Sequence, residues 1–284
     1  QPLDLAPIRT GLPQLAAALG DHSDQAAEGI MTTDTQPKEI AVQFTAGGKT
    51  CTIGGIAKGS GMIHPNLATM LVFLTTDFAV SPAMLQSALS GDVKDTFNMV
   101  SIDGDTSTND MVAVLANGLA GNAEITAPGA DFTAFCSALN SVTVWLCRQI
   151  AGDGEGATRL LECCVTGAAD HCTAKTVAKS IICSSLVKAA MFGADANWGR
   201  VLCAIGYTPG DFDISKTSVR LKSKAGEVFV CENAAYHPYS EDEAAKVLAE
   251  HDILVKVDMG TGDASAKAWG CDLTYDYVKI NGDY

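Results

Sequence analysis

Basic residues are scarce in this sequence of 284 residues. Lys and Arg together number 19, against 33 Asp and Glu, and the formal net charge is −14 at pH 7. Nucleic acids and anionic membrane surfaces attract proteins mainly through Lys and Arg, so this balance argues against both. An acidic surface mostly favours solubility. We therefore expect neither nucleic acid nor membrane among the partners.

Long apolar runs and a leader sequence are also missing. No stretch contains the about 18 uninterrupted apolar residues that a membrane-spanning helix needs. Residues 1–5 have neither the basic region nor the apolar core of a signal peptide, and they do not begin with Met. We expect a cytoplasmic protein, and a chain that is part of something longer or the product of processing.

The ten cysteines include no C-x-x-C pair. Most lie in apolar runs such as 181–183 and 201–203, which is typical of reduced, buried cysteines in a cytosolic protein. One close group of Cys and His does not have the spacing of a standard zinc finger, so we expect no metal site. That group consists of Cys163, Cys164, His171 and Cys172.

Strand-like and helix-like patterns are mixed throughout the chain. Apolar or alternating runs predict strands at 39–44, 50–53, 70–74, 160–165, 217–221, 228–231, 253–257 and 273–280. Helical spacing and capping signals predict helices at 12–19, 81–89, 111–119, 131–150, 173–192 and 240–250. Glycines at 47–48 and 226 predict hairpins. The class is therefore α+β (mixed α/β), with sheets that are at least partly antiparallel.

The bond between Ala68 and Thr69 is the strongest candidate for chemistry. Thr69 follows a Gly- and Pro-containing segment, 54–66, expected to be a loop, and it precedes the apolar run 70–74. Its hydroxyl can attack the carbonyl carbon of Ala68. Once that bond is cut, Thr69 has both a nucleophilic oxygen and a free amine that serves as base. An Ala-Thr dipeptide alone rarely does this, so the prediction depends on the neighbouring residues.

Lys58 is a second candidate, on the segment 54–61. These residues lack the Gly-Lys-Ser/Thr order of a phosphate-binding loop, so we expect their glycines to let the backbone approach a ligand or Thr69 closely. An ammonium group at Lys58 can bind a carboxylate or stabilise a developing oxyanion. The alternative is an ordinary solvated loop lysine.

Glu155 lies between two glycines in a turn after the helix expected at 131–150. A carboxylate in such a turn can face a cleft and recognise an α-amino group. The alternative is an exposed turn carboxylate. Arg200 is expected to make a structural ion pair or an interface contact.

The segment 103–110 has acidic and polar residues at alternate positions. It is unlike a calcium-binding loop, because position 12 would be Val114 where a bidentate Glu is required. We expect a hydrogen-bonded loop that supports a helix at 111–119.

Seven separated motifs together span the chain. They are Thr32–Thr35 with Pro37 and Lys38, Gly55–Leu71, Thr75–Asp77, Asp103–Asp110, Asp153–Thr158, Asp195–Arg200 and Trp269–Asn281. Together they resemble the ornithine acetyltransferase family of arginine biosynthesis. The resemblance implies a self-cleaving Thr-nucleophile fold of layered sheets covered by helices, with a smaller C-terminal α/β domain. It implies a catalytic domain at 1–158 and the C-terminal domain at 159–284.

The resemblance also implies an activity. Precursors of this family cleave themselves at the bond matching Ala68–Thr69, so that residues 1–68 end the α chain and residues 69–158 begin the β chain. The two chains stay together as an αβ heterodimer that forms a larger oligomer. Thr69 is then the nucleophile of a ping-pong transfer of acetyl from N2-acetylornithine to glutamate, through an acetyl-Thr69 ester. The enzyme expected is a glutamate N-acetyltransferase.

Substrate contacts follow from the same resemblance. Thr32, Lys58, Thr69, Glu155 and Asn281 fall where the family binds substrate. No cofactor is expected, although acetyl-CoA can serve as co-substrate in an additional amino-acid N-acetyltransferase activity.

Two departures from the family and one rival are noted. The family's preceding segment, with a Thr-Gly pair that forms the oxyanion hole, and a substrate-binding Ser or Thr near the end do not occur in this sequence. We therefore expect a fragment lacking the N-terminal part. The rival is a self-cleaving aminopeptidase or amidase that uses Thr69 but passes the acyl group to water.

Overall fold

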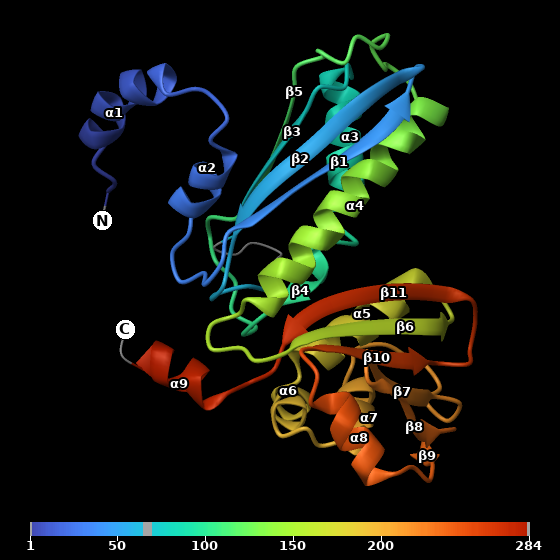
Figure 1. Ribbon diagram of the computed structural model, residues 1–284. Helices are drawn as coiled ribbons and strands as arrows, with labels where there is room; N and C mark the ends of the chain where they lie inside the picture. Colours follow the sequence, from blue (N-terminus) through green and yellow to red (C-terminus); the bar gives the residue numbers. More distant parts are fainter. Residues whose placement is uncertain (1, 65–69, 283–284) are drawn as a thin grey trace.

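The computed structural model describes residues 2–64 and 70–282. Its fold is built on two β-sheets (Figure 1). The first sheet has four strands in the order β1-β2-β3-β5. These are β1 (Lys38–Ala46), β2 (Lys49–Lys58), β3 (Leu71–Thr76) and β5 (Met111–Ala116). The pairs β1–β2 and β2–β3 are antiparallel, and β3–β5 is parallel.

The turn between β1 and β2 is specified by its two glycines. Gly47 and Gly48 have φ of 57° and 69°, the left-handed region that glycine adopts without strain. The register runs unbroken from Ala46 opposite Lys49 to Lys38 opposite Ala57. The predicted hairpin is confirmed, and it places Lys38 and Lys58 near one end of the sheet.

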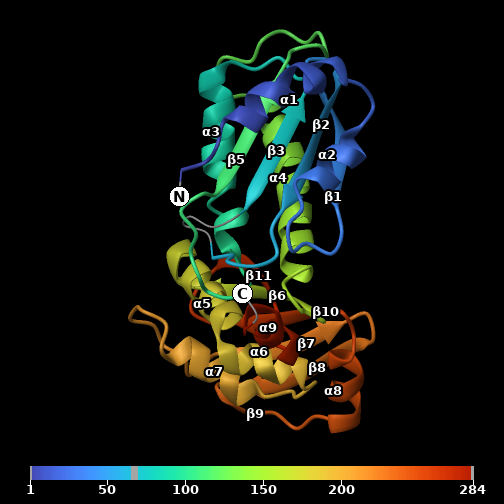
Figure 2. The same ribbon diagram turned by 90° about the vertical axis from the view of Figure 1, so that its left-hand side faces the viewer.

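One face of this sheet is covered by α3 (Pro82–Asp92) and α4 (Ala130–Gly152), which form the core with it. Three rings pack where sheet and helix meet, with centroids 5.4 Å apart for Phe44 and Phe78 and 5.0 Å apart for Phe78 and Phe135. Such pairs add about 1 kcal/mol beyond burial. The opposite face carries α1 (Ala6–Ala17) and α2 (Ser23–Gly29), as Figure 2 shows. Every residue of α1 is at least partly exposed.

The second sheet has seven strands in the order β4-β11-β6-β10-β7-β8-β9. They are β4 (Val100–Ser101), β11 (Ala264–Cys271), β6 (Leu160–Ala168), β10 (Asp252–Asp258), β7 (Ser218–Ser223), β8 (Gly226–Glu232) and β9 (Ala235–Tyr236). β6 and β10 are parallel, whereas β11–β6, β10–β7 and β7–β8 are antiparallel. The predicted mixed α/β class is therefore confirmed.

Capping residues begin several helices of the second half of the fold. α5 (His171–Cys183) and α8 (Glu241–Leu248) pack on the second sheet, and α6 (Ser185–Phe192) and α7 (Trp198–Gly206) pack against α5. A single helix was expected at 173–192, but it breaks at Ser184, whose hydroxyl accepts from the Val187 amide and begins α6. Ser240 caps α8 as predicted, accepting from the Glu243 amide.

Three further sequence predictions are wrong. Residues 54–58 are not part of a loop but the end of β2. Residues 111–116 form β5 rather than a helix, because they pair with the whole of β3. The strand expected at 273–280 is instead helix α9 (Tyr275–Gly282), which begins where the Thr274 hydroxyl accepts from the Tyr277 amide. The strand of this region lies earlier, as β11.

The cysteines follow the expectation in part. None of the ten, all of which lie in the described part of the chain, forms a disulfide, and five are buried. Cys172 and Cys203 are exposed, contrary to the expectation for the apolar run 201–203.

The sequence division between residues 158 and 159 falls between α4 and β6. The two sheets lie on either side of this point, but β4 comes from the first segment and pairs with β11 of the second. The domain boundary stays a prediction. In the described ranges, no helix has the length and apolarity to cross a membrane.

Candidate active site

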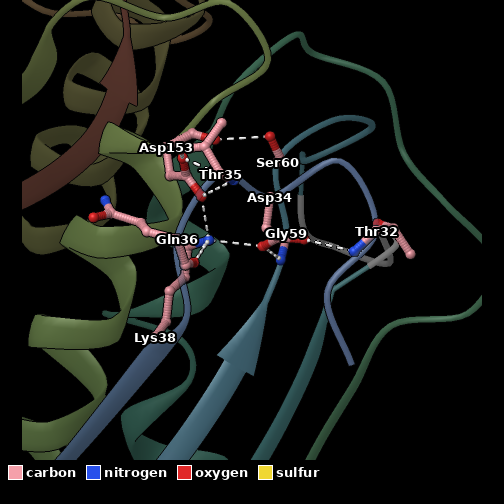
Figure 3. Close-up of polar contacts among 8 residues, drawn as sticks. All are labelled: Thr32, Asp34, Thr35, Gln36, Lys38, Gly59, Ser60 and Asp153. Atoms are coloured by element: carbon pink, nitrogen blue, oxygen red, sulfur yellow. Dashed lines mark hydrogen bonds and ion pairs between the residues drawn. The ribbon is translucent and has the colours of Figure 1, made fainter. Parts of the chain in front are cut away.

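Four segments meet where the end of β2 approaches the turn that follows α4, and Figure 3 shows residues from three of them. They are the stretch Thr32–Lys38 before and at the start of β1, the end of β2 at Lys58 to Gly61, the turn Asp153–Gly156, and α9. Three of them carry a residue predicted from the sequence to bind substrate, and α9 adds a fourth.

A buried lysine lies at the centre of this arrangement. The Lys38 side chain is completely buried, and its Nζ lies 2.7 Å from Asp34 Oδ1 and 2.6 Å from Asp153 Oδ2. Thr35 donates to the Asp153 carboxylate through both its backbone N–H and its hydroxyl. Buried charges are tolerated when they are paired and hydrogen-bonded in this way. The three side chains therefore fix the turn after α4 against the start of β1.

Asp34 joins two other parts of the site. Its Oδ1 accepts from the Gly59 backbone N–H at 2.7 Å, and its Oδ2 accepts from the Thr32 backbone N–H at 3.2 Å. Burial raises the pKa of Asp34, but the Gly59 N–H and the Lys38 ammonium outweigh burial and hold that pKa below its ordinary value. Asp34 is therefore ionised at neutral pH and able to hold Thr32 and the end of β2 together.

Lys58 is buried at the end of β2, with 3% of its surface exposed. The alternative of a solvated loop lysine is therefore wrong. Burial lowers the pKa of Lys58, and the Lys38 charge lowers it further, while three nearby carboxylates oppose the shift. These carboxylates belong to Asp34, Asp110 and Glu155.

Glu155 is also buried, with 8% of its surface exposed, so the alternative of an exposed turn carboxylate is wrong. Its backbone N–H donates to the Ser60 carbonyl at 3.0 Å, and its Oε2 accepts from Asn281 Nδ2 at 2.9 Å. Gly61 lies directly against it, because a Cβ at Gly61 would be 2.4 Å from Glu155 Cδ. The close backbone approach expected of the 54–61 glycines thus occurs at Gly61, toward a protein carboxylate.

The segment 101–111 holds the residues on both sides of 65–69. Asp103 accepts from the Met62 and Ile63 amides at 2.7 and 3.1 Å, and Asp110 Oδ1 accepts from the Met70 amide at 2.6 Å. The hydrogen-bonded loop expected at 103–110 is present, but it leads into a strand rather than a helix. Ala68 and Thr69, the predicted cleavage site and nucleophile, lie outside the described residues.

Comparison with known proteins identifies the family. The model of the ArgJ family matches residues 1–284. The chain belongs to the ArgJ family. The family prediction made from the seven motifs is confirmed, and with it the prediction that the protein is an enzyme.

Individual relatives agree with this assignment. The arginine biosynthesis bifunctional protein ArgJ of Symbiobacterium thermophilum is 51% identical, covering 100% of this chain and 70% of the relative. The protein of the same name from Caldanaerobacter subterraneus subsp. tengcongensis is 49% identical with the same coverage. A crystal structure of argJ from Bacillus halodurans matches with a TM-score of 0.71 and 46% identity, over 75% of this chain and 98% of that chain.

The substrate positions expected from the ArgJ resemblance differ in their surroundings. Lys58 and Glu155 are buried and electrostatically coupled, and Asn281 bonds Glu155. Thr32 is exposed, and in the described part of the chain its backbone N–H bonds Asp34. Arg200 lies elsewhere, donating to the Leu186 carbonyl at 2.9 Å in a structural role.

Four polar residues of the site were given no individual role from the sequence: Asp34, Lys38, Asp153 and Tyr277. All four lie in motifs that carried the resemblance, yet nothing local indicates that Lys38 and Asp153, 115 residues apart, form an ion pair. Burial, together with nearby carboxylates that include Asp103, raises the pKa of Tyr277 to about 12. In the described residues, no group of three or more Cys, His, Asp or Glu is placed to hold a metal.

Proposed function

We propose that the full-length protein catalyses acetyl transfer from N2-acetylornithine to glutamate. The observation that carries this proposal is a pair of buried side chains whose charges interact: Lys58 at the end of β2, and Glu155 with its Asn281 partner. An amino acid presents a carboxylate and an amine or ammonium on one carbon. Lys58 is suited to bind the α-carboxylate, and Glu155 the α-amino group.

Thr69 supplies the nucleophile in this proposal. The Thr69 amine, freed by cleavage after Ala68, takes the proton from the Thr69 hydroxyl, directly or through one water. The oxygen attacks the acetyl carbonyl carbon, ornithine leaves with a proton on its α-amine, and an acetyl-Thr69 ester remains. The α-amine of glutamate then attacks the ester and takes the acetyl group, restoring the hydroxyl. Two half-reactions that share one ester give ping-pong kinetics.

Self-cleavage at Ala68–Thr69 is part of the proposal. Residues 69–284 make up about three quarters of this chain. The match to the Bacillus halodurans structure also covers 75% of this chain, and it takes up 98% of that chain. A separate polypeptide that begins near Thr69 would have this size. The two pieces would form an αβ heterodimer and then a larger oligomer.

The remaining parts of the proposal concern the donor and the compartment. The relatives are named bifunctional, and a second activity that uses acetyl-CoA as donor would make N-acetylglutamate. No cofactor takes part in either reaction as proposed. Ten cysteines without a disulfide are in keeping with a reducing cytoplasm.

A donor and acceptor assay tests the function. The full-length protein is incubated with N2-acetylornithine, with and without glutamate, and ornithine, acetate and N-acetylglutamate are measured. Glutamate-dependent formation of N-acetylglutamate is expected. Acetate release that does not depend on glutamate would instead support the hydrolase.

A Thr69→Ala variant tests the nucleophile. It should remain one uncleaved band and show no transfer, whereas the wild-type protein gives two chains. A variant that still cleaves and transfers acetyl would overturn the role of Thr69.

A further inference from the structure

Lys38 is a charged residue that the proposed reaction does not use. It lies under the site, completely buried between Asp34 and Asp153, and also donates to the Gln36 carbonyl at 3.4 Å (Figure 3). Burying three charged groups costs several kcal/mol per ion unless their mutual geometry compensates. Apolar residues at all three positions would avoid that cost, so stability alone does not account for a buried ion triad here.

Each carboxylate of this ion triad, Asp34–Lys38–Asp153, controls a different part of the site. Asp34 holds the amides of Thr32 and Gly59, the latter directly after Lys58. Asp153 begins the turn that carries Glu155.

That turn is also fixed to the end of β2. The Ser60 hydroxyl donates to the Asp153 carbonyl at 2.7 Å, and the Glu155 amide donates to the Ser60 carbonyl at 3.0 Å. Among the described residues, Lys38 is therefore the one group that bonds both Asp34 and Asp153. These two carboxylates set the positions of Lys58 and Glu155.

We propose that Lys38 is a positioning residue that, through Asp34 and Asp153, sets both the placement and the charge of the Lys58–Glu155 pair. This inference rests on the proposed function for the roles of Lys58 and Glu155. Within the triad, the Asp34 charge and the Lys38 charge act on Lys58 with opposite signs. Lys38 therefore moderates the field that Asp34 alone would impose on Lys58.

The electrostatic part has a definite sign. Among the described residues, the charges that act on the pKa of Lys58 include those of Asp34, Lys38, Asp110 and Glu155. The Asp34 charge raises the pKa of Lys58 and the Lys38 charge lowers it. Asp34→Asn should therefore lower the pKa of Lys58. Lys38→Met should raise it, because the substitution removes a positive charge that disfavours a second positive charge at Lys58.

Enzyme kinetics give the first readout. Only protonated Lys58 binds a carboxylate, so KM for N2-acetylornithine should rise as pH increases through the pKa of Lys58. In full-length protein, this rise should move to lower pH in Asp34→Asn and to higher pH in Lys38→Met. Opposite shifts from two partners of one ion pair are not expected from a loss of stability, which would act in the same direction for both.

A matched control removes a partly buried ion pair elsewhere. Glu162, in β6 of the second sheet, accepts from Lys267 Nζ at 2.9 Å and from Trp269 Nε1 at 3.1 Å. It also pairs with Arg148 of α4. Glu162→Gln should lower the melting temperature without moving the alkaline rise of KM. The proposal for Lys38 is wrong if both triad variants move the pH of the KM rise in the same direction. It is also wrong if neither variant moves that pH relative to Glu162→Gln.

A second readout needs no catalysis. Proteins labelled with 13C at lysine Cε, with the Lys58 signal assigned by Lys58→Arg, allow the pKa of Lys58 to be followed by NMR. Opposite shifts in the two variants support the electrostatic role of Lys38 even if the wild-type protein transfers no acetyl, which would refute the proposed function alone. Normal transfer with no opposite shifts by NMR would refute the inference alone.

Discussion

Asn281 Nδ2 donates a hydrogen bond to Glu155 Oε2 at 2.9 Å across 126 residues of sequence. The bond connects α9 with the turn that follows α4. The same Nδ2 also donates to the Tyr277 carbonyl at 3.0 Å, so both hydrogens of the side-chain amide can be used. A helix with no buried residue thereby supplies a polar group to a buried carboxylate.

Asn281→Ala should weaken substrate binding. The substitution leaves Glu155 Oε2 without this donor, and a hydrogen bond to a charged group contributes about 1.5–3 kcal/mol, so KM should rise about tenfold or more. Steady-state kinetics of the full-length protein measure this effect. Asn140→Ala is the matched control, since Asn140 Nδ2 donates to Asp92 Oδ1 at 2.8 Å on the exposed surface. An equal change in both variants would contradict the role of Asn281.

Gly61→Ala should reduce both stability and activity. Its Cβ would be 2.4 Å from Glu155 Cδ, and overpacking of this kind costs about 1–3 kcal/mol. Thermal unfolding and kcat/KM report the two effects. Gly91 in α3 offers the opposite case, because a Cβ there meets no atom within 4 Å, and Gly91→Ala should stabilise the protein by about 0.5–1 kcal/mol. Normal kinetics in Gly61→Ala would show that Glu155 can move without consequence.

Stability should depend on Asp34 in acid. The pKa of Asp34 is lowered in the fold, so its contribution is fully present above the ordinary value of 3.8 and is lost as pH falls through the lower folded value. Urea unfolding of the wild-type protein and of Asp34→Asn should differ most at neutral pH and converge in acid. A difference that is constant with pH would mean that the Asp34 charge contributes nothing to stability.

Asp110 should behave in the opposite way. Burial raises its pKa, although the Met70 amide and Lys58 oppose the shift, and its Oδ2 accepts no hydrogen bond from the described residues. Ionisation therefore costs stability at pH values above its folded pKa. Asp110→Asn should raise the melting temperature at pH 7, with the gain shrinking at acidic pH where the wild-type carboxyl is protonated.

Self-cleavage should slow in the same variant, because Asp110 holds the amide that follows Thr69. Faster cleavage on denaturing gels would argue against that.

Local signals were sufficient for the elements that carry their own capping or turn residues. The glycines of the β1–β2 turn and the Ser240 cap of α8 specify those elements within a few residues. The apolar run at 111–116 has no such signal, and its assignment as β5 depends on pairing with β3, about 40 residues earlier. Residues 273–280 were predicted as a strand for a similar reason. The actual strand, β11, pairs with β6 and ends just before them.

The site was predictable to the extent that motifs carried it. Lys58, Glu155 and Asn281 were named from the resemblance, and the structure brings them together. Lys38 could not be given its role from sequence, because a lysine that begins a strand is ordinarily exposed. Its burial follows only from two carboxylates that reach it from different segments.

The connection between β2 and β3 contains the predicted scissile bond, and the two strands pair from Lys58 opposite Leu71 to Ile53 opposite Thr76. A cut there would turn the molecule into a split protein with complementary halves. The smaller half would keep β1 and β2 as the end of the sheet, with β2 paired to β3 and both strands packed against α4 of the larger half. Dilution should not separate them, whereas denaturant should, and remixing should rebuild the four-stranded sheet. The β1–β2 hairpin would then be held to the larger half by non-covalent contacts. Each half alone would expose apolar surface and an unpaired strand, and would tend to aggregate.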